Sequence, residues 1–269
     1  MARKFNQRVN VIPNSVRNLL VAITLLLATT FSANALDITT TGTTTTITIE
    51  GSLDDIPSDY CPYLPTGTTH LIINNSANHS FNMYDAFTNC ASLKEVTIIG
   101  NVRSMYKAFL SCASLEKVTI NGNVDVMNWT FEKCGLLQGV TINGNVNAMF
   151  GAFSGCASLQ EVTIKGNVNS IKEAFYKCSS LKEITFTQIT PPQMERSHMF
   201  EGAFYNVPGP VVVNLPFGAD ESEWEAKLID ADLTNFTIKL GRDPNTPRNK
   251  TNIGRINIKR GKLEIRPRK

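Results

Sequence analysis

The sequence has little of what most enzymes and metalloproteins need. It contains three histidines, at positions 70, 79 and 198, which leaves little material for histidine-based catalysis or a multi-histidine metal site. It lacks a C-x-x-C pair or any other Cys/His cluster. It also lacks a nucleophile elbow, a phosphate-binding loop, an H-E-x-x-H motif and an EF-hand loop. These absences predict a protein that is not an enzyme and that holds no metal and no cofactor.

No charge of one sign dominates the whole chain, yet the charges are unevenly distributed. The 26 Lys+Arg and 23 Asp+Glu residues give a net charge of only +3. Residues 1–35 carry four basic and no acidic groups, and residues 242–269 carry ten basic and two acidic groups. The intervening 36–241 is net −9. An acidic body therefore lies between two basic ends, and its apolar content excludes wholesale disorder.

The first 35 residues have the pattern of a secretory signal peptide. A basic start precedes an apolar run at 19–28, and Ala33-Asn34-Ala35 is an A-x-A cleavage signature. The alternatives are a signal anchor or a buried helix, but the run is shorter than the roughly 20 residues of a spanning helix. We predict cleavage near Ala35 and a secreted or cell-surface protein, with the periplasm as an alternative. No later segment is long and apolar enough to span a bilayer, so we expect no transmembrane anchor after cleavage.

A 22-residue repeat fills the middle of the chain. Five cysteines lie 22 residues apart, at 90, 112, 134, 156 and 178. A Phe precedes each of them by three residues, a Leu follows by three, and a Val-Thr-Ile-like triplet follows the Leu. The unit reads A-F-x-x-C-x-S-L-x-x-V-T-I-x-G-N-V-x-x-M. A period of 20–29 residues with this leucine and strand pattern is typical of leucine-rich repeats.

The repeat predicts a leucine-rich-repeat solenoid. We expect a right-handed coil rich in β-strands, with short helical or 3₁₀ segments on its convex side and irregular caps. Val-Thr-Ile is the predicted strand, with its first and third residues facing the core and Thr facing outward. Gly-Asn is the predicted turn that leaves the strand. One unit cannot bury enough apolar surface alone, so the fold depends on stacking.

Both ends of the array are irregular. The Thr-rich run Thr39–Ile49 is interpreted as a strand, with a solvated linker as the alternative; Glu221–Asp230 is a predicted short helix, and Phe236–Ile238 a predicted closing strand. The predicted segments are a signal peptide at 1–35, an N-terminal cap and degenerate first repeat at 36–85, five 22-residue repeats at 86–187 with the last incomplete, a degenerate repeat and cap at 188–241, and a basic tail at 242–269.

The unit A-F-x-x-C-x-S-L-x-x-V-T-I resembles the BspA-like bacterial leucine-rich-repeat family, over roughly residues 64–215. The resemblance implies a curved solenoid on an exported protein, often at the cell surface, and an association with adhesion to host matrix proteins or to other cells. The chain is short for such a protein and carries no cell-wall sorting motif and no lipobox.

The outward strand positions are the candidate ligand-binding residues. They form three columns: a variable one before the threonines, the threonines themselves, and a variable one after them. A solenoid sheet presents these positions as a rigid, extended surface, which suits ligand binding. The alternative is that they are ordinary solvated positions chosen for strand propensity. The candidates are Glu95, Thr97, Ile99, Lys117, Thr119, Asn121, Thr141, Asn143, Glu161, Thr163, Lys165, Glu183, Thr185 and Thr187, with Gly139 in the first column.

The cysteines allow two interpretations. Six cysteines in an exported chain are compatible with a disulfide framework, and adjacent turns lie within the Cα distance that a disulfide needs. Stacked equivalent side chains point in parallel, however, which favours free buried thiols. Cys61 stands outside the period, and a Cys61–Cys90 bridge across the cap is the pairing left open.

The basic tail is the second candidate for a functional segment. Its alternating pattern indicates a small hairpin with Ile256, Ile258, Leu263 and Ile265 on one face. Its charge suits an anionic envelope surface, and docking onto the acidic solenoid, a sorting signal or a solvated tail are the alternatives. Its candidate residues are Arg255, Lys259, Arg260, Lys262 and Arg266.

We therefore expect an exported binding protein that recognises an extracellular protein or glycan through its concave strand face, and no nucleic-acid partner. The alternative function is a self-associating structural protein of a surface, with the tail as anchor or sorting signal.

Overall fold

The computed structural model describes residues 36–49, 55–75, 79–191 and 202–244, and the backbone of 256–259 and 262–264. The predicted signal peptide at 1–35 lies outside these residues, as do Arg255, Arg260 and Arg266 of the tail. No helix among the described residues has the length and hydropathy needed to cross a membrane.

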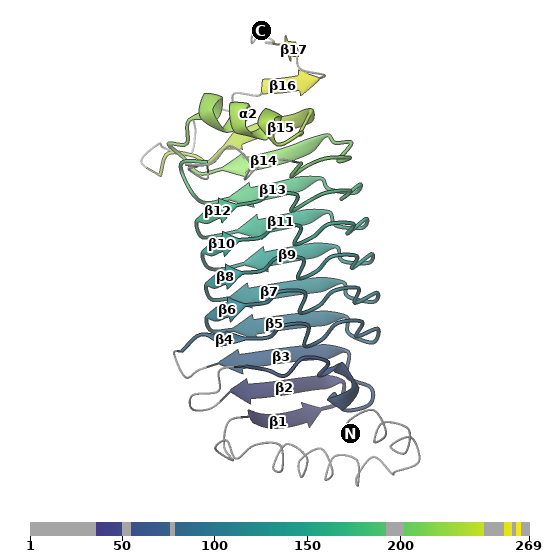
Figure 1. The fold of residues 1–269 in the computed structure, drawn as a ribbon. Helices are drawn as coiled ribbons and strands as arrows, with labels where there is room; N and C mark the ends of the chain where they lie inside the picture. Colours follow the sequence, from purple (N-terminus) through teal and green to yellow (C-terminus); the bar gives the residue numbers. More distant parts are fainter. Residues whose placement is uncertain are drawn as a thin grey trace.

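The chain forms a stack of similar turns that runs from the N-terminal to the C-terminal end of a long sheet (Figure 1). Within the described residues this sheet has twelve strands, in the order β1-β2-β3-β5-β7-β9-β11-β13-β14-β15-β16-β17. Their bounds are β1 Leu36–Thr41, β2 Thr44–Ile49, β3 His70–Asn75, β5 Glu95–Ile99, β7 Lys117–Asn121, β9 Gly139–Ile142, β11 Glu161–Ile164, β13 Glu183–Phe186, β14 Val211–Leu215, β15 Asn235–Leu240, β16 Ile256–Lys259 and β17 Lys262–Glu264.

Neighbouring turns pair in register. From β2 to β15 the strands are parallel. From β5 to β13 each residue pairs with the residue 22 positions later, as Thr97 does with Thr119 and Thr141 with Thr163. The first and third residues of Val-Thr-Ile are buried, and Thr is half-buried on the outer side. The predicted leucine-rich-repeat solenoid is thus the observed fold, and the predicted strand columns lie where the pattern placed them.

A second, smaller parallel sheet follows each Gly-Asn turn, and the sequence analysis did not predict it. Five strands form it within the described chain, in the order β12-β10-β8-β6-β4. They are short: β4 Phe81–Asn82, β6 Val102–Ser104, β8 Val124–Val126, β10 Val146–Ala148 and β12 Val168–Ser170. The valine that begins each of β6, β8, β10 and β12 is buried, and the next residue is exposed. The side chains of this sheet therefore also alternate between the core and the solvent.

The segment between the second sheet and the next long strand consists of tight turns. Ala108 N–H donates to the Met105 carbonyl and Cys112 N–H to the Phe109 carbonyl, at 3.0 and 3.4 Å. Bonds from residue i to i−3 are the 3₁₀ pattern, in keeping with the predicted 3₁₀ turns. Adjacent turns are also bonded to each other here, as in Phe87 N–H to the Ala108 carbonyl at 2.8 Å.

The core is built of columns that run along the stack. The phenylalanines of consecutive turns stack nearly parallel, with ring centroids 5.1 to 5.7 Å apart from Phe87 to Phe204. The Cys, Leu, Val and Ile columns beside them are buried. Each turn covers the apolar face of the one before it, which is why the unit needs its neighbours.

The two ends differ from the interior in their strand direction. The predicted single strand at Thr39–Ile49 is in fact two antiparallel strands, β1 and β2, because the chain reverses at Gly42, which has φ +61°. Helix α2, Glu221–Asp230, covers the far end of the core with Trp224 and Leu228, as predicted. The strand predicted to close the array, β15, is not the last, because β16 pairs with it antiparallel and β17 pairs with β16.

Candidate functional site

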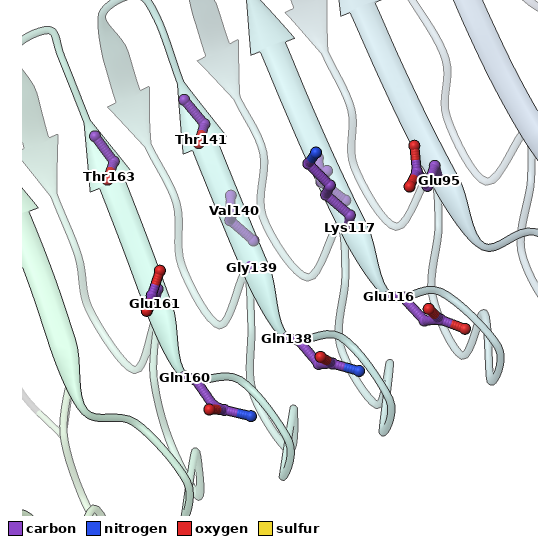
Figure 2. Close-up of a pocket in the computed structure, with 11 residues that line it drawn as sticks. Glu95, Glu116, Lys117, Gln138, Gly139, Val140, Thr141, Gln160, Glu161 and Thr163 are labelled. Carbon is purple, nitrogen blue, oxygen red and sulfur yellow. The ribbon is translucent and has the colours of Figure 1, made fainter.

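The candidate site is a groove on the outward face of the long sheet, which we call the strand face. Its volume is about 440 Å³. Figure 2 shows its side chains, which project from neighbouring strands and from the turns that precede them. The lining residues are Glu95, Glu116, Lys117, Val118, Gln138, Gly139, Val140, Thr141, Gln160, Glu161 and Thr163.

The groove lies where one strand lacks a side chain. Gly139 begins β9 and pairs with Lys117 on one side and Glu161 on the other. A Cβ at Gly139 would meet no atom within 4 Å, so the space above it is open. The groove is therefore a gap in a column of long polar side chains, with a cation on one wall and an anion on the other.

The charges on the two walls are available to a ligand. Lys117 and Glu161 are exposed, and neither has an ion pair or side-chain hydrogen bond to another described residue. Several other charged side chains on this face have partners. Lys94 lies 3.7 Å from Glu116, and Lys182 Nζ donates to Gln160 Oε1 at 2.9 Å.

The strand face continues beyond the groove in both directions. Towards the N-terminal end, His70 Nε2 lies 3.9 Å from Glu95 Oε2. Towards the C-terminal end, Asn214 donates to Glu183 Oε1 at 2.6 Å and to Thr185 Oγ1 at 3.1 Å. These contacts fix side chains on a rigid sheet, which lowers the entropy cost of ordering them when a ligand binds.

The structure brings only some of the predicted site residues into the groove. Glu95, Lys117, Thr141, Glu161 and Thr163 line it. The predicted residues that share the face but lie outside the groove are Thr97, Ile99, Thr119, Asn121, Asn143, Lys165, Glu183, Thr185 and Thr187. Asn143, Lys165 and Thr187 follow the ends of their strands. Asn143 Nδ2 donates to Asn121 Oδ1 at 2.7 Å, and its own buried Oδ1 has no partner among the described residues.

Sequence reasoning missed the residues that precede the strands. Glu116, Gln138 and Gln160 line the groove, although each lies one position before a strand begins. Their column carries a polar side chain in every repeat, at 94, 116, 138, 160 and 182. That uniform polarity beside the strand face is the signal that could have found them.

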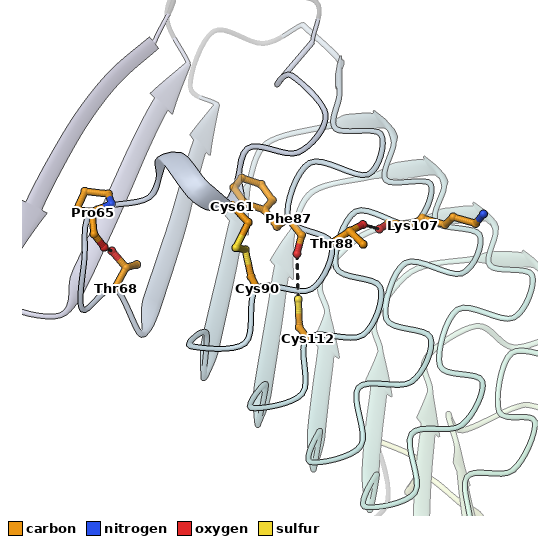
Figure 3. The surroundings of a disulfide bond; sticks show 8 residues. All are labelled: Cys61, Pro65, Thr68, Phe87, Thr88, Cys90, Lys107 and Cys112. Atoms are coloured by element: carbon orange, nitrogen blue, oxygen red, sulfur yellow. Dashed lines mark hydrogen bonds between the residues drawn. A yellow bond between two sulfur atoms is a disulfide. The ribbon is translucent and has the colours of Figure 1, made fainter. Parts of the chain in front are cut away.

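The cysteines divide into one disulfide and a column of thiols. Figure 3 shows the disulfide and the first free thiol, Cys112. Cys61, at the start of the 3₁₀ turn η3, Cys61–Tyr63, is bonded to Cys90. Cys112, Cys134, Cys156 and Cys178 are free and buried. Each of these thiols donates to a carbonyl 25 residues earlier, at 3.0 to 3.1 Å; the Cys112 thiol bonds to Phe87. Within the described ranges, no three His, Cys, Asp or Glu side chains are grouped so as to hold a metal ion.

The tail extends the long sheet. Lys259 pairs with Asn235 of β15, and the β16–β17 hairpin pairs Lys259 with Lys262. The tail backbone therefore adds two antiparallel strands to the end of the solenoid. Lys259 and Lys262 are the two predicted tail residues that fall within the described backbone.

Parallel strands that pair in register every 22 residues, with a variable polar face, define a leucine-rich-repeat solenoid. The chain matches the BspA type leucine-rich-repeat region in six copies, over residues 40–151, 66–182 and 107–208. These matches cover more than half of the chain, and the protein belongs to this family. The fold of this family is typically a non-enzymatic scaffold for protein binding.

No curated protein sequence matches the chain. A crystal structure of a leucine-rich repeat protein from Bacteroides ovatus aligns with 79% of this chain and 100% of its own, at 13% identity and a TM-score of 0.18.

Proposed function

We propose that the protein is an exported binding protein that recognises an extracellular protein or glycan ligand through the strand face. The observation that carries this proposal is the open gap at Gly139 between the unpaired Lys117 and Glu161. The constant core columns hold the array, while the strand face gathers residues that vary from turn to turn. Rigid solenoid surfaces of this kind serve extended ligands.

The chemistry of the groove favours a polypeptide over a neutral sugar chain. One wall is cationic and the other anionic, and Gln138 and Gln160 offer both donors and acceptors between them. A polypeptide that carries charges of both signs would pair with both walls, and such complementarity fixes register. Secretion, which the A-x-A signature at 33–35 supports, would place the ligand outside the cell.

The proposal is tested by filling the gap without disturbing the fold. Gly139→Gln places a side chain where a Cβ meets no neighbour, so we expect native folding and loss of binding to the matrix proteins that the parent protein retains in a screen. Gly135→Gln is the matched control, because a Cβ at Gly135 also meets no atom within 4 Å and Gly135 lies outside the groove. Binding by Gly139→Gln that equals the parent protein would refute the proposal.

A second variant tests the charge pattern. Lys117→Glu combined with Glu161→Lys keeps the net charge and exchanges the two walls. We expect it to bind more weakly than the parent, because each wall would then meet a like charge. An unchanged affinity would show that the two charges do not contact the ligand.

The second candidate function is self-association at a surface, with the tail as anchor or sorting signal. The addition of β16 and β17 to the end of the sheet favours it. The tail then supplies the edge strand of the sheet, and an edge strand can pair with another chain. Removing residues 245–269 tests it at low and high salt. Binding or assembly that disappears with the tail would make the solenoid a carrier for it.

A further inference from the structure

Four aromatic side chains form a continuous strip on the turns that follow the second sheet. Tyr84, Tyr106, Trp129 and Phe150 come from four consecutive turns of the solenoid. Consecutive ring centroids are 6.1, 5.4 and 4.5 Å apart. We call these four residues the aromatic strip. None of them lines the groove on the strand face.

The strip is not part of the core. Tyr84 is 50% exposed, and Tyr106, Trp129 and Phe150 are partly exposed. The core has its own aromatic column, which runs from Phe87 to Phe204 and is fully buried. Aromatic side chains gathered on a surface mark an interaction site more often than isolated ones do.

Trp129 is held in a conformation that a bulky residue rarely adopts. Its φ is +53°, in the left-handed region that disfavours large side chains. The equivalent positions in other turns are Asp85, Lys107, Gly151 and Glu173, and all of them have positive φ. The backbone therefore demands this conformation in every turn, and tryptophan is a poor residue for it. Strained residues of this kind cluster at ligand-binding sites.

The next turn makes room for the indole. A Cβ at Gly151 would lie 2.8 Å from both Cδ1 and Nε1 of Trp129, so the ring rests directly on the glycine backbone. Phe150 packs against it edge to face, at an interplanar angle of 73°. Asn128 accepts the Phe150 backbone N–H at 2.9 Å and holds that segment in place. The indole is thus positioned rigidly at the surface.

Polar residues of the second sheet precede the strip in each turn. Arg103, Asp125 and Asn147 are exposed on the second sheet, three or four residues before Tyr106, Trp129 and Phe150 respectively. Lysines stand at the rings: Lys107 Nζ is 5.1 Å from the Tyr106 centroid and Lys172 Nζ is 5.8 Å from that of Phe150. A ligand at the strip could therefore pack on the aromatic rings and form hydrogen bonds with the polar side chains.

We propose that the aromatic strip binds a glycan chain, with sugar rings lying along Tyr84, Tyr106, Trp129 and Phe150. A pyranose has an apolar C–H face, which suits the negative face of an aromatic ring, and a rim of hydroxyls, which suits the exposed Arg, Asp and Asn side chains of the second sheet. The strip presents about one ring per turn along the solenoid axis, which matches a ligand that is itself a chain of rings. A proline-rich peptide would instead need an aromatic-lined groove.

This site is separate from the strand face and does not depend on the function proposed for it. The groove variant Gly139→Gln should leave glycan binding by the strip unchanged. Variants of the strip should leave binding at the groove unchanged. Failure of one proposal is therefore distinguishable from failure of the other.

The test is affinity electrophoresis of the purified protein in native gels cast with soluble xylan, galactomannan, xyloglucan or mixed-linkage β-glucan. We expect retardation by at least one polysaccharide, and an affinity at least about tenfold lower for Trp129→Ala. Gly151→Asn should weaken binding too, because asparagine tolerates a positive φ and its Cβ displaces the indole. Tyr205→Ala is the control, since Tyr205 is 48% exposed and stacks on Tyr176 outside the strip.

Tryptophan fluorescence supplies an independent measurement. The chain has two tryptophans, and Trp224, which belongs to α2, is fully buried. In a Trp224→Phe background the emission comes from Trp129 alone, and we expect the retarding polysaccharide to shift or quench it. Circular dichroism confirms that each variant is folded.

Three results would overturn the proposal. The first is that none of the four polysaccharides retards the protein. The second is a folded Trp129→Ala protein that is retarded as strongly as the parent. The third is a Trp129 emission that responds to a proline-rich peptide and to no polysaccharide.

Discussion

The disulfide between Cys61 and Cys90 joins the irregular first turn to the start of the regular repeats, with the two Cα atoms 5.6 Å apart. Cys90 belongs to the periodic cysteine column. Because Cys90 lies in the first regular repeat, no regular repeat before it supplies a Phe carbonyl for its thiol. The bridge therefore replaces, at the first turn, the thiol-to-carbonyl contact that begins with Cys112 and Phe87. It anchors the cap that covers the first phenylalanine of the stack.

We predict that Cys61→Ser combined with Cys90→Ser lowers the free energy of unfolding of the N-terminal turns by about 3 to 4 kcal/mol. The bridge closes a loop of 29 residues, and a loop of that size gives a stabilisation of this order. Urea titration followed by circular dichroism measures it. A reducing agent should lower the midpoint of the parent protein and leave that of the double variant unchanged; an equal effect on both would contradict the prediction.

The buried thiols predict a loss of stability at alkaline pH. Burial raises the pKa of the Cys156 thiol to about 12, and burial together with neighbouring Cys156 raises that of Cys178. The pKa of an unfolded cysteine is about 8.5, so above that pH the unfolded chain releases protons that the folded chain keeps. This contribution to stability is present below about pH 8.5 and falls as the pH rises towards 12.

Urea midpoints measured between pH 7 and 10 check this dependence. Cys156→Ala is the comparison, because it removes one titrating thiol; we expect a shallower decline with pH, on top of the cost of the small cavity. An identical decline in the two proteins would show that the thiol does not contribute.

Gly122→Ala is expected to destabilise the array strongly. A Cβ at Gly122 would collide with the backbone of Gly100 in the preceding turn, and backbone cannot move aside as a flexible side chain can. We expect the free energy of unfolding to fall by about 1 to 3 kcal/mol, the usual range for overpacking. Gly135→Ala is the control: a Cβ there meets nothing within 4 Å, so its thermal midpoint should be equal to or above that of the parent.

Tyr60→Phe is expected to stabilise the cap by about 1 kcal/mol. Tyr60 is 2% exposed, burial raises its pKa to about 12, and its hydroxyl has no hydrogen-bond partner among the described residues. A buried polar group without a partner is costly, and phenylalanine removes it while keeping the edge-on contact with Phe87. Tyr63→Phe is the exposed comparison and should change the denaturation midpoint little; a lower midpoint for Tyr60→Phe would reveal a partner for the hydroxyl.

The sequence predicts the framework of this fold well because periodicity reports burial. The Val-Thr-Ile strands and the Trp224 helix lie where the pattern placed them. The second sheet escaped prediction because strands as short as Val124–Val126 are too brief to show an alternating pattern. The reversal at Gly42 escaped because a uniform run of threonines conceals where one strand ends and the next begins.

The candidate sites were harder to predict, for a geometric reason. The groove depends on an absence, the missing side chain of Gly139, whereas a list of outward positions reports only what is present. The aromatic strip escaped because Trp129 stands one position later in its repeat than Tyr106 and Phe150 do in theirs. Only the folded turns show that the indole reaches both rings.

The in-register pairing of the turns has a consequence for how such a chain changes over time. Every interior turn meets its neighbours through equivalent residues, as Glu161 meets Gly139 and Glu183. A duplication or deletion of one 22-residue unit therefore joins surfaces that already fit, and it lengthens or shortens the array without a new core. The caps at either end would stay as they are, while both outer surfaces would gain or lose one row of side chains.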